Sequence, residues 1–183
     1  MTKVDRIDMN ILAQLQQDGA LSQRELADRV SLSQNACWRR LQRLRETGLI
    51  QGSTTQINLA ALGFSLTVHV MVRTHHHTKD WADRFRKHVE RLPEVIDFHR
   101  IGGDWDYMIK VVCDGMSGYD SFYQRLITNF DLDRVTGLFS MEAIVDNRPP
   151  DLTRLLAHME SLASAKPNKK NTRTTKKPMS RPW

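Results

Sequence analysis

The sequence predicts an α+β protein with an N-terminal winged helix-turn-helix followed by a ferredoxin-like βαββαβ sandwich. Apolar residues recur at helical spacing over roughly the first 47 positions, and beyond residue 60 strand-like alternation is interleaved with helical patterns. The chain of 183 residues is long enough for two small domains. We therefore place one domain at 1–60 with the helix-turn-helix at about 22–41, a second at 61–150, and a short helix with a basic tail at 151–183.

Three helices are expected in the first domain. The segment 5–16 repeats apolar residues every three or four positions, which is the pattern of a helix with one buried face. Ser22 and Glu25 have the spacing of a capping box and predict a second, short helix through residue 30. Ser33 can cap a third helix that runs to Thr47 and stops at Gly48.

The second domain begins after a mixed segment, 50–63, which we expect to hold a small wing strand and a connector, with the boundary near Leu59. The expected elements that follow are a strand at 64–73, a helix at 80–92, strands at 95–101 and 105–112, a helix at 117–130 and a strand at 135–145. This order is that of a ferredoxin-like sandwich, whose open sheet usually finds a partner. A helical stretch at 152–163 precedes a tail that cannot bury enough apolar surface to order itself.

The net charge of +6 does not by itself predict a nucleic-acid partner. Residues 166–183 hold seven basic residues and no acidic one, so the rest of the chain has 20 basic and 21 acidic residues. No apolar run approaches the roughly 18 residues of a membrane helix, and the N-terminus lacks the apolar stretch of a signal peptide. Two distant cysteines form no disulfide framework, so we expect a cytoplasmic protein without a membrane partner.

The helix at 33–47 is the candidate nucleic-acid element. One stripe, formed by Cys37, Leu41 and Leu44, would pack on the first two helices, and the opposite side carries Arg, Asn and Gln, which can pair with bases in a major groove. The candidate DNA-binding residues are Ser33, Gln34, Asn35, Arg39, Arg40, Gln42 and Arg43. The alternative is a solvated amphipathic helix, on which outward arginines carry no function. We expect Trp38, between the two faces, to be a partly buried packing residue, and Cys37 to be a small buried hydrophobe.

The chain resembles a known family over residues 3–145. In the first half the matching residues are Asp5, Asp8, Ile11-Leu12, Leu15, Ser22, Glu25-Leu26-Ala27, Leu32-Ser33, Cys37, Arg40-Leu41, Arg43-Leu44 and Gly48-Leu49-Ile50. In the second half they are Pro93-Glu94-Val95, Gly103-Asp104-Trp105-Asp106-Tyr107 and Met141-Glu142. As a set they resemble the leucine-responsive, or AsnC (feast/famine), family of bacterial and archaeal transcriptional regulators. Ala36 is a departure, because members often have proline there.

The resemblance implies a DNA-binding domain that recognises a double-stranded operator and a RAM-type ligand-sensing domain that dimerises through its sheet. Dimers of this family often assemble into tetramers or octamers and bind an amino acid where neighbouring second domains meet. The segments 75–77, 37–38 and 98–100 look closest to a branch that responds to cysteine or other sulfur amino acids. The implied protein is a nucleoid-associated prokaryotic regulator, with control of amino-acid metabolism as its role.

By matched motif, the implied effector site comprises the hairpin residues Arg100, Gly102, Gly103, Asp104 and Asp106, together with Met116, Leu138, Phe139 and Ser140. The chemistry fits an amino acid, because glycine backbone amides can hold an α-carboxylate and an aspartate can pair with an ammonium group. The alternative is purely structural: Gly-Gly-Asp is good hairpin chemistry, and Asp106 can simply cap the turn.

Two features of the sequence are also found in other classes of protein. The run 102–106 superficially resembles the GGDEF loop of nucleotide cyclases, but the first strand ends in Val72-Arg73-Thr74, without a metal-binding carboxylate, and the domain is too short. The triple histidine 75–77 cannot converge on one ion, and a solvated loop is the simpler reading. We expect no enzyme, catalytic residue, metal or cofactor. An architectural DNA-binding protein without an effector, whose basic tail supplies sequence-independent affinity, remains the alternative function.

Overall fold

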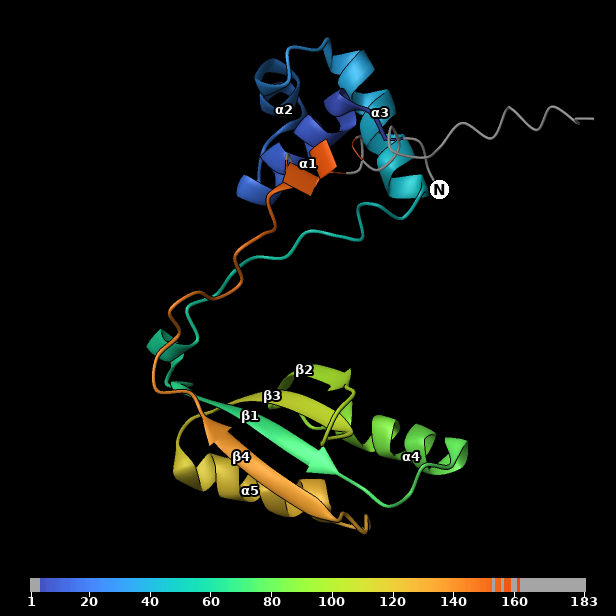
Figure 1. Ribbon diagram of the computed structural model, residues 1–183. Helices are drawn as coiled ribbons and strands as arrows, with labels where there is room; N and C mark the ends of the chain where they lie inside the picture. The colour runs from blue at the N-terminus through green and yellow to red at the C-terminus, as the bar shows by residue number, and fades with distance from the viewer. Residues whose placement is uncertain (1–3, 153, 156, 159–160, 162–183) are drawn as a thin grey trace, which may run out of the picture. The chain divides into compact units, whose positions relative to one another are not determined.

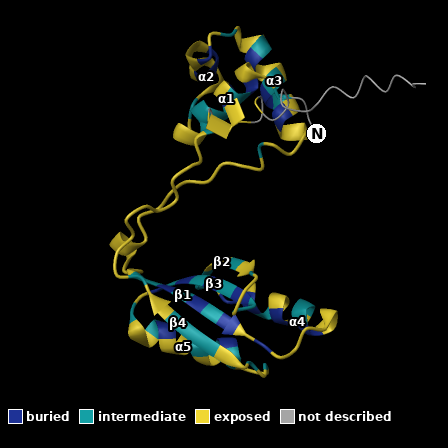
Figure 2. Ribbon diagram, viewed as in Figure 1, coloured by how far each residue is buried: buried dark blue, intermediate teal, exposed yellow. Residues whose placement is uncertain are grey.

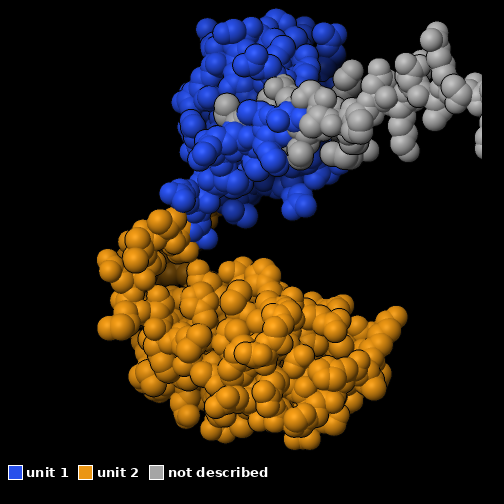
Figure 3. All heavy atoms as spheres, viewed as in Figure 1, with its two compact units in different colours: residues 1–54, 147–183 blue, residues 55–146 orange. Residues whose placement is uncertain are grey.

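The computed structural model describes residues 4–152, 154–155, 157–158 and 161. It divides into two compact units, one formed by residues 1–54 with 147–183 and the other by Thr55–Asp146 (Figure 3). The chain therefore passes from one unit to the other twice. Of the helix expected over 152–163, the described residues are helical, and the basic tail at 166–183 lies outside the described part. No helix in the described part is long and apolar enough to cross a membrane.

The first unit contains the three predicted helices, α1 (Arg6–Gln17), α2 (Gln23–Arg29) and α3 (Gln34–Glu46) (Figure 1). Each begins at a side-chain cap. The predicted capping box of α2 is present, with the Ser22 amide donating to Glu25 Oε2 at 2.8 Å and the Glu25 amide to Ser22 Oγ at 3.3 Å. Ser33 Oγ accepts from the Ala36 amide at 3.3 Å, and Gly48 follows α3 with a φ of 71°.

A small apolar core joins the three helices. Its fully or nearly fully buried members are Ile11, Leu26, Ala27, Val30, Cys37, Leu41 and Leu44. Cys37 is fully buried, as predicted, and burial raises the pKa of its thiol. The predicted packing stripe of α3 is therefore confirmed.

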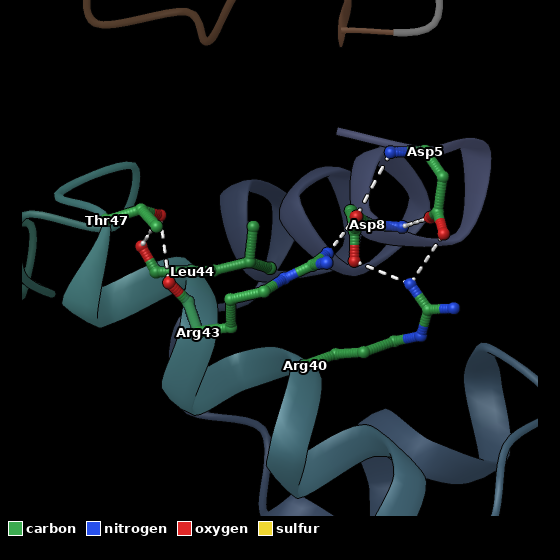
Figure 4. A network of polar contacts seen from close by, with 6 residues as sticks. All are labelled: Asp5, Asp8, Arg40, Arg43, Leu44 and Thr47. Atoms are coloured by element: carbon green, nitrogen blue, oxygen red, sulfur yellow. Dashed lines mark hydrogen bonds and ion pairs between the residues drawn. The ribbon is translucent and has the colours of Figure 1, made fainter. Parts of the chain in front are cut away.

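A carboxylate, Asp8, is also fully buried in this unit. Asp8 closes a capping box with Asp5 at the start of α1: the Asp5 amide donates to Asp8 Oδ2 at 3.0 Å and the Asp8 amide to Asp5 Oδ1 at 2.8 Å. From α3, Arg40 Nη1 donates to Asp8 Oδ1 at 2.8 Å and to Asp5 Oδ2 at 2.7 Å, and Arg43 Nη2 donates to Asp8 Oδ2 (Figure 4). This network, which we call the Asp8 cluster, ties the N-terminus of α1 to the middle of α3.

The charges in the Asp8 cluster favour one another. The hydrogen bond from the Asp8 amide, together with the Arg40 guanidinium, lowers the pKa of Asp5, and the hydrogen bonds to Asp5 and Asp8 raise the pKa of Arg40. A buried carboxylate without such partners would lose several kcal/mol of hydration. The two arginines therefore offset the cost of placing Asp8 inside the domain.

The wing strand expected within 50–63 does not form in this chain. Residues 51–58 are exposed and adopt neither helix nor strand, and Ala60–Leu62 forms one 3-10 turn. A strand needs a neighbour for its backbone hydrogen bonds, and the described residues of the first unit include no strand that could pair with it.

The second unit is the predicted sandwich. Its elements are β1 (Leu66–Arg73), α4 (Lys79–Val89), β2 (Val95–Arg100), β3 (Tyr107–Cys113), α5 (Met116–Ile127) and β4 (Arg134–Phe139). The sheet order is β2-β3-β1-β4, and every neighbouring pair is antiparallel. The last strand is shorter than the predicted 135–145. The Ser140 amide makes a final bond to the Thr67 carbonyl at 2.9 Å, and β1 begins at Leu66, so the residues beyond have no strand to pair with.

Within the described part of the chain, helices cover only one face of the sheet. The buried residues of β1 and β3 form one core cluster with Phe85 of α4 and Phe122 of α5. Figure 1 shows the two helices beside the sheet, and Figure 2 shows the buried stretches of β1 and β3. The close approach of α5 to β4 requires Gly137, because a Cβ there would lie 2.3 Å from Tyr119 Oη. The opposite face, which we call the open face, carries Thr67, His69, Met71, Met108, Lys110 and Val112, all half-buried.

The Asp8 cluster gives a stability prediction. Asp8→Ala removes a helix cap and leaves two arginines without their shared partner, so the free energy of unfolding should fall by about 2–4 kcal/mol. Asp28→Ala is a matched control, because Asp28 is an exposed aspartate of α2, and it should change stability by less than about 0.5 kcal/mol. Urea denaturation followed by far-UV circular dichroism measures both. An Asp8→Ala protein as stable as the control would show that the cluster does not hold the unit together.

Candidate DNA-binding helix and effector site

The turn between α2 and α3 fixes the orientation of α3 relative to α2. Ser31 adopts a positive φ of 55°, and the Leu32 amide donates to the Ala27 carbonyl at 2.9 Å. Gln23 Nε2 at the start of α2 reaches the Gln34 carbonyl at 3.4 Å. These contacts join the beginnings of α2 and α3, so the first turns of α3 are held while its outer side faces solvent.

All seven candidate DNA-binding residues lie on α3 or at its cap. Ser33, Gln34, Asn35, Arg39 and Arg43 are exposed, whereas Arg40 and Gln42 are half-buried. Asn35 and Arg39 lie nearly opposite the buried stripe on the helical wheel, which places them at the outermost part of the helix. This is the arrangement in which a recognition helix presents polar side chains to base edges.

The arginines of α3 fall into two groups. Arg40 and Arg43 are engaged by Asp5 and Asp8, although the Arg43 side chain remains 46% exposed. Arg39 has no hydrogen-bond or ion-pair partner among the residues that the structure describes. A shallow hollow of about 410 Å³ lies between these groups, lined by Asp5, Leu32, Ala36, Arg39, Arg40 and Arg43. The Arg39 guanidinium is thus exposed and unpaired in the described part of the chain, whereas Arg40 and Arg43 already balance carboxylates.

The prediction for Trp38 needs correction. Its side chain is 48% exposed, and it belongs neither to the buried cluster of the first unit nor to the half-buried residues packed on it. The sequence pattern placed Trp38 between the buried and outer faces, about 100° from the buried stripe, and at that angle the ring does not reach the core cluster. Trp38 is therefore a surface residue of α3.

The hairpin between β2 and β3 holds the first group of candidate effector residues. Arg100, Gly102, Gly103 and Asp104 are exposed, and Gly103 has a φ of 111°, which favours glycine. Asp106 is half-buried, and its Oδ2 accepts the Thr74 amide at 2.8 Å. The Asp106 carboxylate therefore ties the hairpin to the end of β1.

The second group lies at the opposite end of the same sheet. Leu138 and Phe139 pair with His69 and Val68 at the start of β1, whereas Arg100 pairs with Tyr107, which pairs with Val72 near the end of β1. Three to four residues of β1 separate these positions, which corresponds to roughly 10–13 Å along the strand, and β2 and β4 are the two edge strands of the sheet. Met116 begins α5 three residues after β3 ends, at the same end of the sheet as Leu138. Within one chain, the hairpin residues and the second group do not form a single pocket.

Each group borders its own hollow. One, of about 320 Å³, is lined by Arg100 together with Ala82, Arg86, Glu90, Phe98 and Tyr107. The other, of about 310 Å³, is lined by Ser140 together with Thr67, His69, Lys110, Glu142, Ala143, Ile144, Val145 and Asp146. Met116, Leu138 and Phe139 are 61%, 53% and 44% exposed, so they present apolar surface without a covering group in the described part of the chain.

The histidine loop between β1 and α4 contains contacts that sequence reasoning missed. His75 Nε2 lies 2.8 Å from Asp133, His76 Nε2 lies 3.2 Å from Asp131, and His77 Nδ1 lies 3.8 Å from Asp106. Arg73 also pairs with Asp133, and this hydrogen bond lowers the pKa of Asp133. The three histidines face three different carboxylates, and no group able to hold a metal ion occurs among the described residues. No local signal reveals these pairs, because they join segments more than 25 residues apart in the chain.

Comparisons with known proteins match both units. A winged helix-turn-helix DNA-binding family matches residues 4–51, and the Lrp/AsnC ligand binding domain matches residues 67–150. The glutamate uptake regulatory protein of Zymomonas mobilis is 39% identical over 142 residues, covering 78% of this chain and 87% of that protein. The DNA-binding transcriptional activator DecR of Escherichia coli is 40% identical over 142 residues, covering 77% and 93%.

Solved structures agree. An AsnC family transcriptional regulator from Agrobacterium tumefaciens has a TM-score of 0.79 at 36% identity and covers 83% of this chain and 99% of its own. A transcriptional regulator from Neisseria meningitidis, solved with L-methionine, has a TM-score of 0.78 at 25% identity and covers 84% and 99%. These relatives are regulators and not enzymes. The chain belongs to the Lrp/AsnC family of transcriptional regulators, with a DNA-binding helix-turn-helix and an amino-acid ligand-binding domain.

Proposed function

We propose that this regulator binds its effector between copies of the chain, so that effector binding controls assembly and thereby the affinity for DNA. The observation that carries the proposal is the separation of the two candidate groups, the 100–106 hairpin and the residues around Leu138, at opposite ends of one sheet. A pocket that needs both groups must take them from different copies. Effector binding then favours one assembly over another, which is how a distant site alters DNA affinity.

The surfaces for assembly are the open face, which is mixed in polarity and partly covered, and a set of exposed apolar residues. The open face would dimerise with a second copy, since a sheet with helices on one side usually finds cover for the other. Next to it, Met141, Ile144 and Val145 are 100%, 87% and 59% exposed, and Leu62 is 64% exposed. Exposed apolar surface of this kind marks an interaction site. We infer a homodimer that assembles further into a tetramer or octamer and works in the cytoplasm on nucleoid DNA.

An amino acid would fit the combined pocket. Backbone amides of Gly102 and Gly103 would receive its carboxylate, and Asp104, which is exposed, would pair with its ammonium group better than Asp106, whose carboxylate already accepts the Thr74 amide. Met116 and Phe139 would contact the side chain, whereas Leu138 points to the opposite face of β4 and would border the site from the open face. An apolar, polarisable wall suits a thioether or thiol, and regulators of similar fold have been solved with L-methionine. We infer a sulfur amino acid, methionine or cysteine, as the effector, and amino-acid metabolism as the regulated process.

The competing function is an architectural DNA-binding protein without an effector. The match of residues 67–150 to a ligand binding domain argues against it. The near neutrality of the chain outside its tail also argues against binding that depends on charge alone.

On DNA, we infer that Arg39 and Asn35 read bases, whereas Arg40 and Arg43 hold α3 in place and touch at most phosphates. Arg39→Ala should weaken binding to a duplex enriched by the wild-type protein from a randomised pool by about tenfold, with a smaller loss on a shuffled duplex. Arg43→Ala should weaken binding to both duplexes equally and lower the melting temperature of the protein. Fluorescence anisotropy and thermal melting measure these effects. Equal losses on both duplexes for Arg39→Ala would assign Arg39 to phosphate contacts.

A mixing experiment tests the shared effector site. Asp104→Ala damages the hairpin half and Met116→Glu the other half, so each variant alone should lose the thermal shift produced by L-methionine or L-cysteine. When the two variants are unfolded, mixed and refolded together, roughly a quarter of the shared sites should regain two intact halves and restore part of the response.

If one chain supplies the whole site, the mixture stays unresponsive, because every chain then carries one damaged half. Asp28→Ala serves as the matched control, since Asp28 is an exposed aspartate of α2 in the first unit, and it should keep the full response. If no amino acid shifts the wild-type protein, the effector proposal itself fails.

A further inference from the structure

Trp38 is an exposed tryptophan on α3 that is not among the residues proposed above to bind DNA or the effector. The other tryptophans of the described part are covered: Trp81 is 6% exposed and packs in the second core, and Trp105 is half-buried beside Arg134. Trp38 instead leaves 48% of its side chain in solvent. Single exposed apolar residues are common on proteins, so exposure alone does not indicate a site. The position of Trp38 on the helix supplies the second observation.

Trp38 is the fifth residue of α3, in the half of a recognition helix that lies nearest to base edges. Asn35 is one turn before it and Gln42 one turn after it, so the three side chains are neighbours on the helix surface. Asn35 and Gln42 are the residue types that pair with adenine in a major groove. An apolar ring therefore lies between two groups suited to read bases.

The charges around Trp38 favour a polyanion as its partner. Arg39 follows it directly and Arg45 lies two turns further along, and both are exposed without an ion-pair partner in the described part of the chain. Arg40 and Arg43 face the other flank, where Asp5 and Asp8 bind them. The single acidic residue of α3 is Glu46, at its C-terminal end. The flank that bears Trp38 thus combines an apolar ring with one free cation, Arg45, and the adjoining outer side of the helix carries a second, Arg39.

We propose that Trp38 is a specificity-determining residue that contacts the C5-methyl group of a thymine in the major groove. That methyl is the apolar feature of the groove, and a ring with one N–H donor and no acceptor suits it better than the polar edge of any other base. The contact rests on α3 being the helix that reads DNA. It adds an apolar element to a recognition surface otherwise made of Asn35, Arg39 and Gln42.

The test compares Trp38→Ala and Trp38→Phe with Ile7→Ala, which truncates an exposed apolar residue of α1 that is 38% exposed. The probes are a duplex enriched by the wild-type protein from a randomised pool and a shuffled duplex of the same composition. Trp38→Ala should bind the enriched duplex with about tenfold lower affinity, and its affinity for the shuffled duplex should fall much less. Trp38→Phe should be intermediate, and Ile7→Ala should bind both duplexes about as tightly as the wild type. Addition of the enriched duplex should also quench tryptophan emission less in Trp38→Phe than in the wild type.

Replacing thymines of the enriched duplex one at a time by uracil removes only the methyl group. One such replacement should weaken the wild-type protein and have no further effect on Trp38→Ala, which is the result of a contact between the two groups. The proposal is overturned if no uracil position behaves in this way, or if Trp38→Ala weakens both duplexes equally. A change in oligomer size on sedimentation with unchanged DNA specificity would instead assign Trp38 to contact with a second copy. Failure of Arg39→Ala and Trp38→Ala alike to alter specificity would show that α3 does not read DNA at all.

Discussion

A four-stranded sheet with helices on one face only is the constraint on which the second unit depends. The helices α4 and α5 bury one side of β1 and β3, whereas the other side is only partly covered, by residues 142–146 and the ion pair between Lys110 and Asp146. The sheet order also places the β2–β3 hairpin and the end of β4 at opposite ends. Both features leave surface unsatisfied within one copy. Assembly with further copies would cover the open face and bring separated groups together, so ligand binding and oligomerisation would become one equilibrium.

The first unit depends on a different interaction, the buried carboxylate of Asp8. Three short helices bury few apolar residues, and an ion pair inside so small a core would be costly without good geometry. The capping box with Asp5 and the two arginines of α3 supply that geometry. The same contacts distinguish Arg40 and Arg43 from Arg39, because a guanidinium that is already hydrogen-bonded to a carboxylate has fewer donors left for a DNA base.

Local patterns predicted the helices and most strands because they depend on neighbours in sequence. Ser22 with Glu25 and Ser33 with Gly48 mark helix ends through bonds made within a few residues. The core stripe of α3 followed from helical spacing alone. The errors lie where a distant neighbour decides: the wing strand lacks a partner strand in this chain, and β4 stops where β1 stops.

The site was predicted less completely than the fold. Motifs found α3 and the hairpin, but periodicity cannot reveal that Arg43 is bound by a carboxylate 35 residues away or that Asp106 is held by Thr74. It also placed Trp38 at the margin of the core, whereas the structure exposes it. The opposite-end location of Leu138 follows from strand pairing, which no single segment encodes. Such long-range contacts have no local signal in a single sequence.

If one effector site combines the two ends of the sheet from different copies, ligand binding must protect both ends together. Hydrogen–deuterium exchange of the full chain, with and without the amino acid that gives the largest thermal shift, measures this protection. We expect simultaneous protection of the 100–106 hairpin and of residues 138–140, at the ligand concentration at which the oligomer size changes. Protection of only one of these segments, or protection of both in a chain that remains a monomer, would rule out a shared site.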